Sequence, residues 1–193
     1  MKRIFSLFLC LMLMSGMVSA VAEETENKLP EQPTSTKVVL CFSATDNTWG
    51  IAEKIAALTG ADILRIEAEI PYTDDDLNWH NNNSRANVEQ NDDTVRPGIA
   101  NLPESLDGYD TVFIGFPIWW GTIPQIIKTL VEAEDFQGKT IVPFCTSGSS
   151  GISSAIRDLK AFESGAEVLD NGRPFSAGAT EKDVQAWLNE IGY

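Results

Sequence analysis

Short, nearly unbroken apolar runs alternate along this chain with amphipathic stretches of helical period. A strand that is apolar on both faces is typical of a parallel sheet covered by helices on each side. Right-handed crossovers make such a sheet doubly wound. The sequence therefore predicts an α/β domain with a five-stranded, doubly wound parallel sheet, whose strands are expected at 38–43, 63–66, 111–116, 139–145 and 167–169.

Helices are expected between these strands and at the end of the chain. The first should end at Gly60, a residue that readily terminates a helix in the left-handed conformation. Others are expected at 125–132 and 152–162, and Thr180 to Asp183 resembles a capping box for a terminal helix. The polar segment 71–106, called the excursion below, is expected to contain at most one short helix. A loop of that length is usually functional or mobile.

The first residues have the pattern of a secretory signal peptide. Lys2 and Arg3 precede an apolar block that is too short to span a bilayer, and small residues follow at Ala20-Val21-Ala22. Cleavage after Ala20 or after Ala22 fits equally well. We therefore expect a signal peptide at 1–22, a disordered acidic leader at 23–36 and the folded domain at 37–193. This organisation implies export to the periplasm or the extracellular space, with no stable membrane anchor after cleavage.

The chain is strongly acidic, with a formal net charge of −14. Removal of the signal peptide takes away two positive charges and no acid, so the charge becomes −16. This balance argues against nucleic acid and anionic membranes as partners, and favours either a basic partner or solubility alone. Cys41 and Cys145 end apolar runs and are expected as buried free thiols, with a disulfide as the second possibility. His80 is the only histidine, so neither a Ser-His-Asp triad nor a zinc site can be assembled from the usual parts.

The loop after the first strand has the composition of a phosphate site. It reads Ser43-Ala44-Thr45-Asp46-Asn47-Thr48 and opens a helix. Unpaired N–H groups at a helix N-terminus can bind a phosphate monoester without a lysine. No Lys or Arg lies between Val38 and Glu53, which argues against a Walker-type nucleotide loop. An ordinary turn with Asn47 or Thr48 as N-cap is the alternative.

Two further loops should lie at the same edge of the sheet, where doubly wound folds bind ligands. One contains Pro117, Ile118, Trp119 and Trp120, and paired indoles in a loop can stack on a conjugated ring. Packing of the indoles on the sheet edge or on the excursion is the alternative. The other loop begins Thr146-Ser147-Gly148 and offers donors and close backbone approach, or is simply a flexible turn. Together the three loops describe a flat heteroaromatic monophosphate, and FMN fits best.

These motifs resemble those of the flavodoxin family, in particular a bacterial group with Pro-Ile-Trp-Trp-Gly and Thr-Ser-Gly loops. The resemblance covers Lys37 to the C-terminus and implies the strand order 2-1-3-4-5. It also implies that Trp119 covers one face of the flavin. The phosphate would be held by Ser43, Thr45, Asn47 and Thr48, and the pyrimidine edge of the flavin would be lined by Thr146, Ser147 and Gly148.

The chain departs from the family pattern at two places. Asp46 stands where flavodoxins usually have glycine, and its carboxylate would weaken phosphate binding unless the side chain turns outward. The loop at 146–151 has no aromatic residue, so the second flavin face is either open or covered by Tyr72 or Trp79 from the excursion.

Three functions are compatible with this reading. We expect an electron carrier that docks basic redox partner proteins. The second possibility is an FMN-dependent reductase, in which NAD(P)H or a quinone stacks on the open flavin face. The third is a secreted binding module that has kept the fold without flavin. The fold alone does not decide among them.

Overall fold

The computed structural model describes residues 27–162 and 165–193, and the predicted signal peptide lies outside these residues. The strands are β1 (Lys37–Phe42), β2 (Asp62–Ile66), β3 (Thr111–Pro117), β4 (Thr140–Thr146), β5 (Glu167–Val168) and β6 (Arg173–Phe175). The helices are α1 (Trp49–Thr59), α2 (Arg85–Gln90), α3 (Gln125–Ala133), α4 (Ser153–Phe162) and α5 (Glu181–Ile191). No helix in the described ranges is long and apolar enough to cross a membrane.

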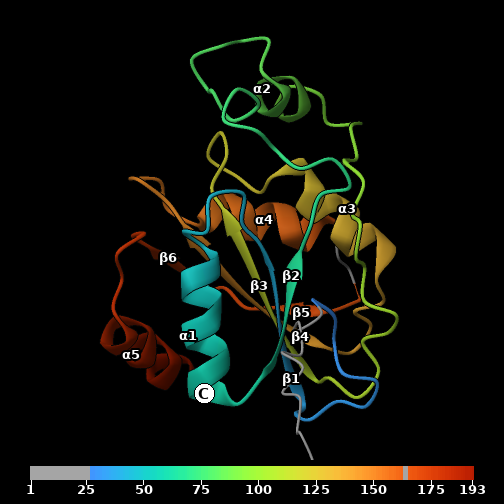
Figure 1. The fold of residues 1–193 in the computed structure, drawn as a ribbon. Helices are drawn as coiled ribbons and strands as arrows, with labels where there is room; N and C mark the ends of the chain where they lie inside the picture. The colour runs from blue at the N-terminus through green and yellow to red at the C-terminus, as the bar shows by residue number, and fades with distance from the viewer. Residues whose placement is uncertain (1–26, 163–164) are drawn as a thin grey trace, which may run out of the picture.

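The sheet is parallel throughout and has the order β2-β1-β3-β4-β5. This confirms the predicted doubly wound α/β architecture. Helices α1 and α5 lie on one side of the sheet, and α3 and α4 lie on the other (Figure 1). Helix α2 lies beyond the carboxyl ends of the strands, within the excursion (Figure 1).

Each central strand contributes to two hydrophobic cores. In β1, Val38, Leu40 and Phe42 face the core under α3 and α4, whereas Val39 and Cys41 face the core under α1 and α5. Successive residues of a strand point to opposite faces, so a strand covered on both faces must be apolar at every position. This burial explains the unbroken apolar runs of the sequence.

The edge of the sheet beside β4 is formed by two short segments. The predicted strand at 167–169 is present as β5, and β6, which was not predicted, pairs with the second half of β4. The Ile141 carbonyl accepts from the Leu169 N–H, and the Ser147 N–H donates to the Phe175 carbonyl. The backbone N–H and carbonyl groups of every second residue of β4 therefore point toward this edge. Pro143 is one of them and has no N–H to donate. The break between β5 and β6 lies opposite this missing donor.

The predicted ends of two helices are confirmed. Helix α1 ends at Gly60, whose φ of 65° is left-handed. Helix α5 begins with a reciprocal capping box between Thr180 and Asp183. Cys41 and Cys145 are buried free thiols, as expected.

Residues 27–36 fall in the segment predicted as a disordered leader, yet they have defined contacts. The Asn27 side chain donates to the Arg65 carbonyl at 3.0 Å and accepts from the Arg65 N–H at 3.1 Å. The Thr34 N–H and hydroxyl both donate to the Asp62 carboxylate. Asn27 thus binds unpaired backbone groups of β2, which is an edge strand, whereas Thr34 binds a side chain of the same strand.

Candidate functional site

The loops after β1, β3 and β4 meet at the carboxyl edge of the sheet. The Oγ1 atoms of Thr48 and Thr146 lie 2.6 Å apart, which joins the loop after β1 to the end of β4. The Ile118 N–H donates to the Thr146 carbonyl at 2.9 Å, which joins the loop after β3 to the same point. The fold therefore brings together the three loops that the sequence singled out.

The start of α1 presents uncapped backbone donors. Within the described part of the chain, no group accepts a hydrogen bond from the N–H groups of residues 44–49. Thr48 occupies the N-cap position but makes no capping bond, because its hydroxyl contacts Thr146 instead. The exposed side chains of Thr45 and Asn47 bond to each other at 3.2 Å. Free N–H groups at a helix N-terminus are the donor set that an anion requires.

The Asp46 side chain turns outward, the orientation that phosphate binding requires. It is 74% exposed, and the residue has a φ of 61° in the left-handed region. One Arg65 nitrogen, Nη2, contacts the Asp46 carboxylate at 2.5 Å and the Ser43 carbonyl at 2.8 Å. Arg65 comes from β2, so the loop has a neighbouring cation that its own sequence lacks. A search for positive charge within the loop could not have found it.

Trp119 and Thr122 form the ends of a tight hairpin. The Trp119 N–H donates to the Thr122 carbonyl at 3.1 Å, and the Thr122 N–H returns a bond at 3.0 Å. The two central residues, Trp120 and Gly121, have φ values of 47° and 82°. Positive φ at both central positions defines a type I′ turn, in which tryptophan is unusual.

The two indoles of this hairpin have different surroundings. Trp119 is half-buried and packs edge-to-face with Phe42 and Tyr72, at centroid distances of 5.6 and 5.3 Å. Trp120 is 45% exposed at the hairpin tip. Trp119 is therefore held among aromatic side chains, while Trp120 projects from the surface.

The two aromatic residues of the excursion that could cover the second flavin face, Tyr72 and Trp79, also have different surroundings. Tyr72 belongs to the Trp119 cluster, and its hydroxyl donates to Glu89 at 2.6 Å. Burial, followed by the hydrogen bond to Glu89, raises the pKa of Tyr72 above its ordinary value. Trp79 is 67% exposed and stacks on His80 with ring centroids 3.5 Å apart. Tyr72 is thus placed beside Trp119, whereas the Trp79 ring packs on the histidine.

The loop after β4 retains fewer donors than the sequence suggested. The Ser147 N–H donates to the Phe175 carbonyl at 3.1 Å, because β6 pairs there with β4. The Ser147 hydroxyl and the exposed Gly148 backbone remain for a ligand. Thr146 is buried, and its carbonyl is already bonded to Ile118.

A family model for flavodoxin matches residues 36–191 of this chain. A candidate flavoprotein from Bacteroides uniformis ATCC 8492 is 40% identical, with a TM-score of 0.76 and coverage of 79% of this chain and 97% of that one. A second, from Bacteroides eggerthii DSM 20697, is also 40% identical, with a TM-score of 0.74 and coverage of 81% and 98%.

A more distant structure was determined with its cofactor. The flavoprotein from Lactobacillus acidophilus NCFM in complex with FMN is 20% identical, has a TM-score of 0.57 and is covered over 97% of its length by 78% of this chain. Among curated proteins, none matches this chain. The family model spans most of the chain, and the observed sheet order is that of flavodoxin-like folds. The chain belongs to the flavodoxin family.

Proposed function

We propose that the mature chain binds FMN and carries electrons outside the cytoplasm. The observation that carries this proposal is the contact of three loops at one point, with uncapped N–H groups on one side and the Trp119 hairpin on the other. Family membership and the FMN complex of the Lactobacillus relative support FMN as the cofactor.

The side chains present fit this cofactor. The N–H groups of 44–49, with the hydroxyls of Thr45 and Thr48 and the Asn47 amide, would hold the phosphate. Trp119 would pack on the ring system, and the Ser147–Gly148 backbone and hydroxyl would meet its polar edge. When bound, FMN supplies reversible uptake of one or two electrons.

Three titratable groups near these loops are uncharged at neutral pH. Burial raises the pKa of Cys145 to about 12 and that of Cys41 still further above its ordinary value. The raised pKa of Tyr72 keeps its hydroxyl protonated at neutral pH. These three groups would therefore add neither a charge nor a nucleophile beside the cofactor.

An acidic surface supports a basic redox partner. The net charge of −16 on the mature chain, which is the −14 of the full chain less the two positive charges of Lys2 and Arg3, would steer a positively charged protein toward the molecule, an effect that falls with ionic strength. Export is proposed from the basic start and short apolar block of residues 1–22. N-terminal sequencing of the native protein tests it, with Val21 or Glu23 expected as the first residue and an intact Met1 as the contradictory result.

An FMN-dependent reductase is the second candidate, favoured by the exposed indole of Trp120, on which a nicotinamide or quinone ring could stack. A kinetic assay separates the two. The FMN-loaded protein is mixed with NADH or NADPH and a quinone, and nicotinamide oxidation is followed at 340 nm. A carrier shows negligible turnover and is reduced by dithionite in two separate one-electron steps. Rapid turnover by the isolated protein would establish the reductase instead.

A further inference from the structure

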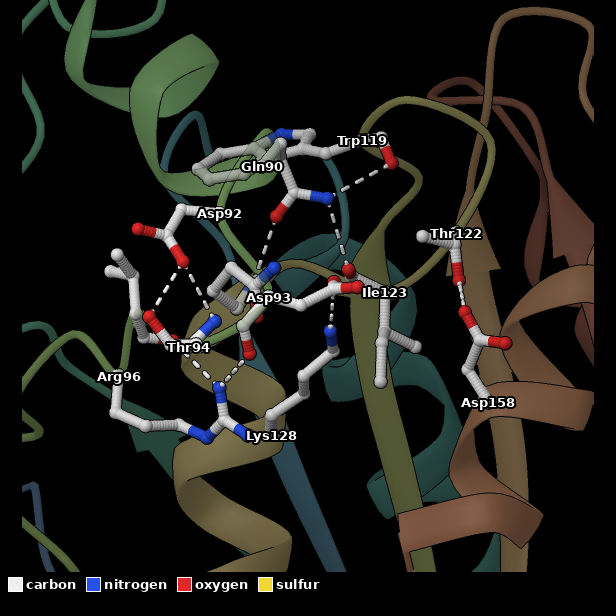
Figure 2. Close-up of polar contacts among 12 residues, drawn as sticks. Gln90, Asp92, Asp93, Thr94, Arg96, Trp119, Thr122, Ile123, Lys128 and Asp158 are labelled. Atoms are coloured by element: carbon white, nitrogen blue, oxygen red, sulfur yellow. Dashed lines mark hydrogen bonds and ion pairs between the residues drawn. The ribbon is translucent and has the colours of Figure 1, made fainter.

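Gln90, the last residue of α2, connects the excursion to the Trp119 hairpin. Its Nε2 donates to the Trp119 carbonyl at 3.4 Å and to the Ile123 carbonyl at 3.2 Å. Its Oε1 accepts from the Gln125 N–H at 2.9 Å. Figure 2 shows this amide between the hairpin and the segment that leads into α3. Both amide protons and the amide oxygen are thus used, which fixes the orientation of the group.

The bond to the Gln125 N–H replaces one that the local chain does not make. Helix α3 begins after Pro124, which makes no side-chain capping bond, so the first N–H of the helix needs an acceptor from elsewhere. Gln90 provides it. The hairpin also contains Trp120 in a left-handed conformation, which is costly for a residue other than glycine. Outside contacts that hold the ends of the hairpin offset that cost.

The excursion is itself held in place, so it can serve as a support for Gln90. The Asn87 amide donates to the carbonyls of Trp79 and Asn81, at 3.1 and 2.7 Å. Glu89, also in α2, accepts a hydrogen bond at 2.6 Å from the hydroxyl of Tyr72, which packs against the domain core. Helix α2 is therefore anchored both within the excursion and to the body of the domain.

The opposite side of the hairpin is held by α4. The Thr122 hydroxyl donates to Asp158 Oδ2 at 2.5 Å (Figure 2). The hairpin that carries Trp119 is thus held by hydrogen bonds from Gln90 on one side and to Asp158 on the other. We propose that Gln90 is a positioning residue of the flavin site: it holds Trp119 in the binding conformation before the flavin arrives. This inference rests on the proposed FMN binding.

The test uses two substitutions at position 90 and one control. Gln90→Met removes all three hydrogen bonds at similar length. Gln90→Glu keeps an acceptor for Gln125 but removes both donors and faces two carbonyls with a carboxylate. Arg96→Met is the control, because it removes another polar link between the excursion and α3 without touching the hairpin.

We expect both Gln90 variants to raise the FMN dissociation constant about tenfold, the equivalent of roughly one net hydrogen bond, and the control to change it less than about twofold. Hydrogen exchange of the flavin-free protein provides a readout independent of binding. The Gln125 N–H should exchange faster in Gln90→Met, but keep most of its protection in Gln90→Glu and in the control.

Unchanged FMN affinity in both Gln90 variants would overturn the inference, as would equal weakening in the Arg96 control. If Gln90→Met does not fold, Gln90→Glu decides alone. Failure of the unmodified protein to bind FMN would overturn the proposed function instead, and in that case the exchange of the Gln125 N–H still decides whether Gln90 holds the start of α3. Unaltered exchange in Gln90→Met would refute that role.

Discussion

The phosphate loop can be tested by removing the side chains of Thr45 and Asn47 together. In the described structure these exposed side chains bond only to each other, at 3.2 Å. The double substitution Thr45→Ala with Asn47→Ala should therefore change the free energy of unfolding by no more than about 0.5 kcal/mol, as is usual for surface positions. Any large change in ligand binding would then reflect contacts with the ligand itself.

The expected loss follows from hydrogen bonds to a charged group. Two such bonds to a phosphate should together contribute about 2–4 kcal/mol. Their loss should raise the dissociation constant for FMN roughly 30- to 1,000-fold. Riboflavin has the same ring system without the phosphate. Its affinity should change less than about twofold, because the altered side chains would contact only the missing group.

The assay is a fluorescence-quenching titration of flavin-free mature protein with FMN and with riboflavin, accompanied by thermal unfolding of both proteins. An FMN affinity that survives the double substitution would refute the phosphate assignment. So would equal weakening of both ligands, or an unmodified protein that binds riboflavin as tightly as FMN. A lowered melting temperature would indicate that the loop had been disturbed rather than its contacts removed.

Three further predictions concern the hairpin tryptophans, Asp46 and Asp62. Trp119→Ala should weaken the binding of oxidised FMN by about 1–2 kcal/mol and make the final reduction step easier. Trp120→Ala, at the exposed tip of the hairpin, should have smaller effects. Titration measures the binding, and potentiometry measures the reduction. Asp46→Gly relieves a left-handed φ and removes a carboxylate from the phosphate loop, although the contact with Arg65 is lost. FMN affinity in titration should therefore be unchanged or higher. Partial burial alone would raise the pKa of Asp62, but hydrogen bonds from its neighbours hold it below the ordinary value. The ionised Asp62 carboxylate therefore stabilises the fold above its unfolded-state pKa, and this stabilisation is lost as pH falls through its folded-state pKa. Asp62→Asn should lack this pH-dependent loss of stability when acid unfolding is measured.

The fold could be predicted from the sequence because each central strand is buried on both faces. The run from Val38 to Phe42 is apolar at every position, and Gly60 ends the next helix in the conformation that glycine favours. Such local patterns specify elements and their order. The short segment β6 escaped prediction because it exists only through pairing with β4, beyond the break opposite Pro143.

The meeting of the three candidate loops could also be predicted, since chain position alone places them at the carboxyl ends of parallel strands. Their supports could not. Arg65 reaches Asp46 from 19 residues along the chain, and Gln90 reaches Trp119 from 29 residues away. Contacts of this kind depend on tertiary packing and leave no periodic trace in the sequence.

FMN binding is tested most directly by the visible absorption spectrum of the mature protein purified from its native source, with mass spectrometry of the extracted cofactor. We expect a yellow protein with flavin bands that shift from those of free FMN, and an extract that contains FMN and neither FAD nor riboflavin. A colourless protein that takes up no FMN on titration would contradict this expectation, and would leave a secreted binding module that has kept the flavodoxin fold.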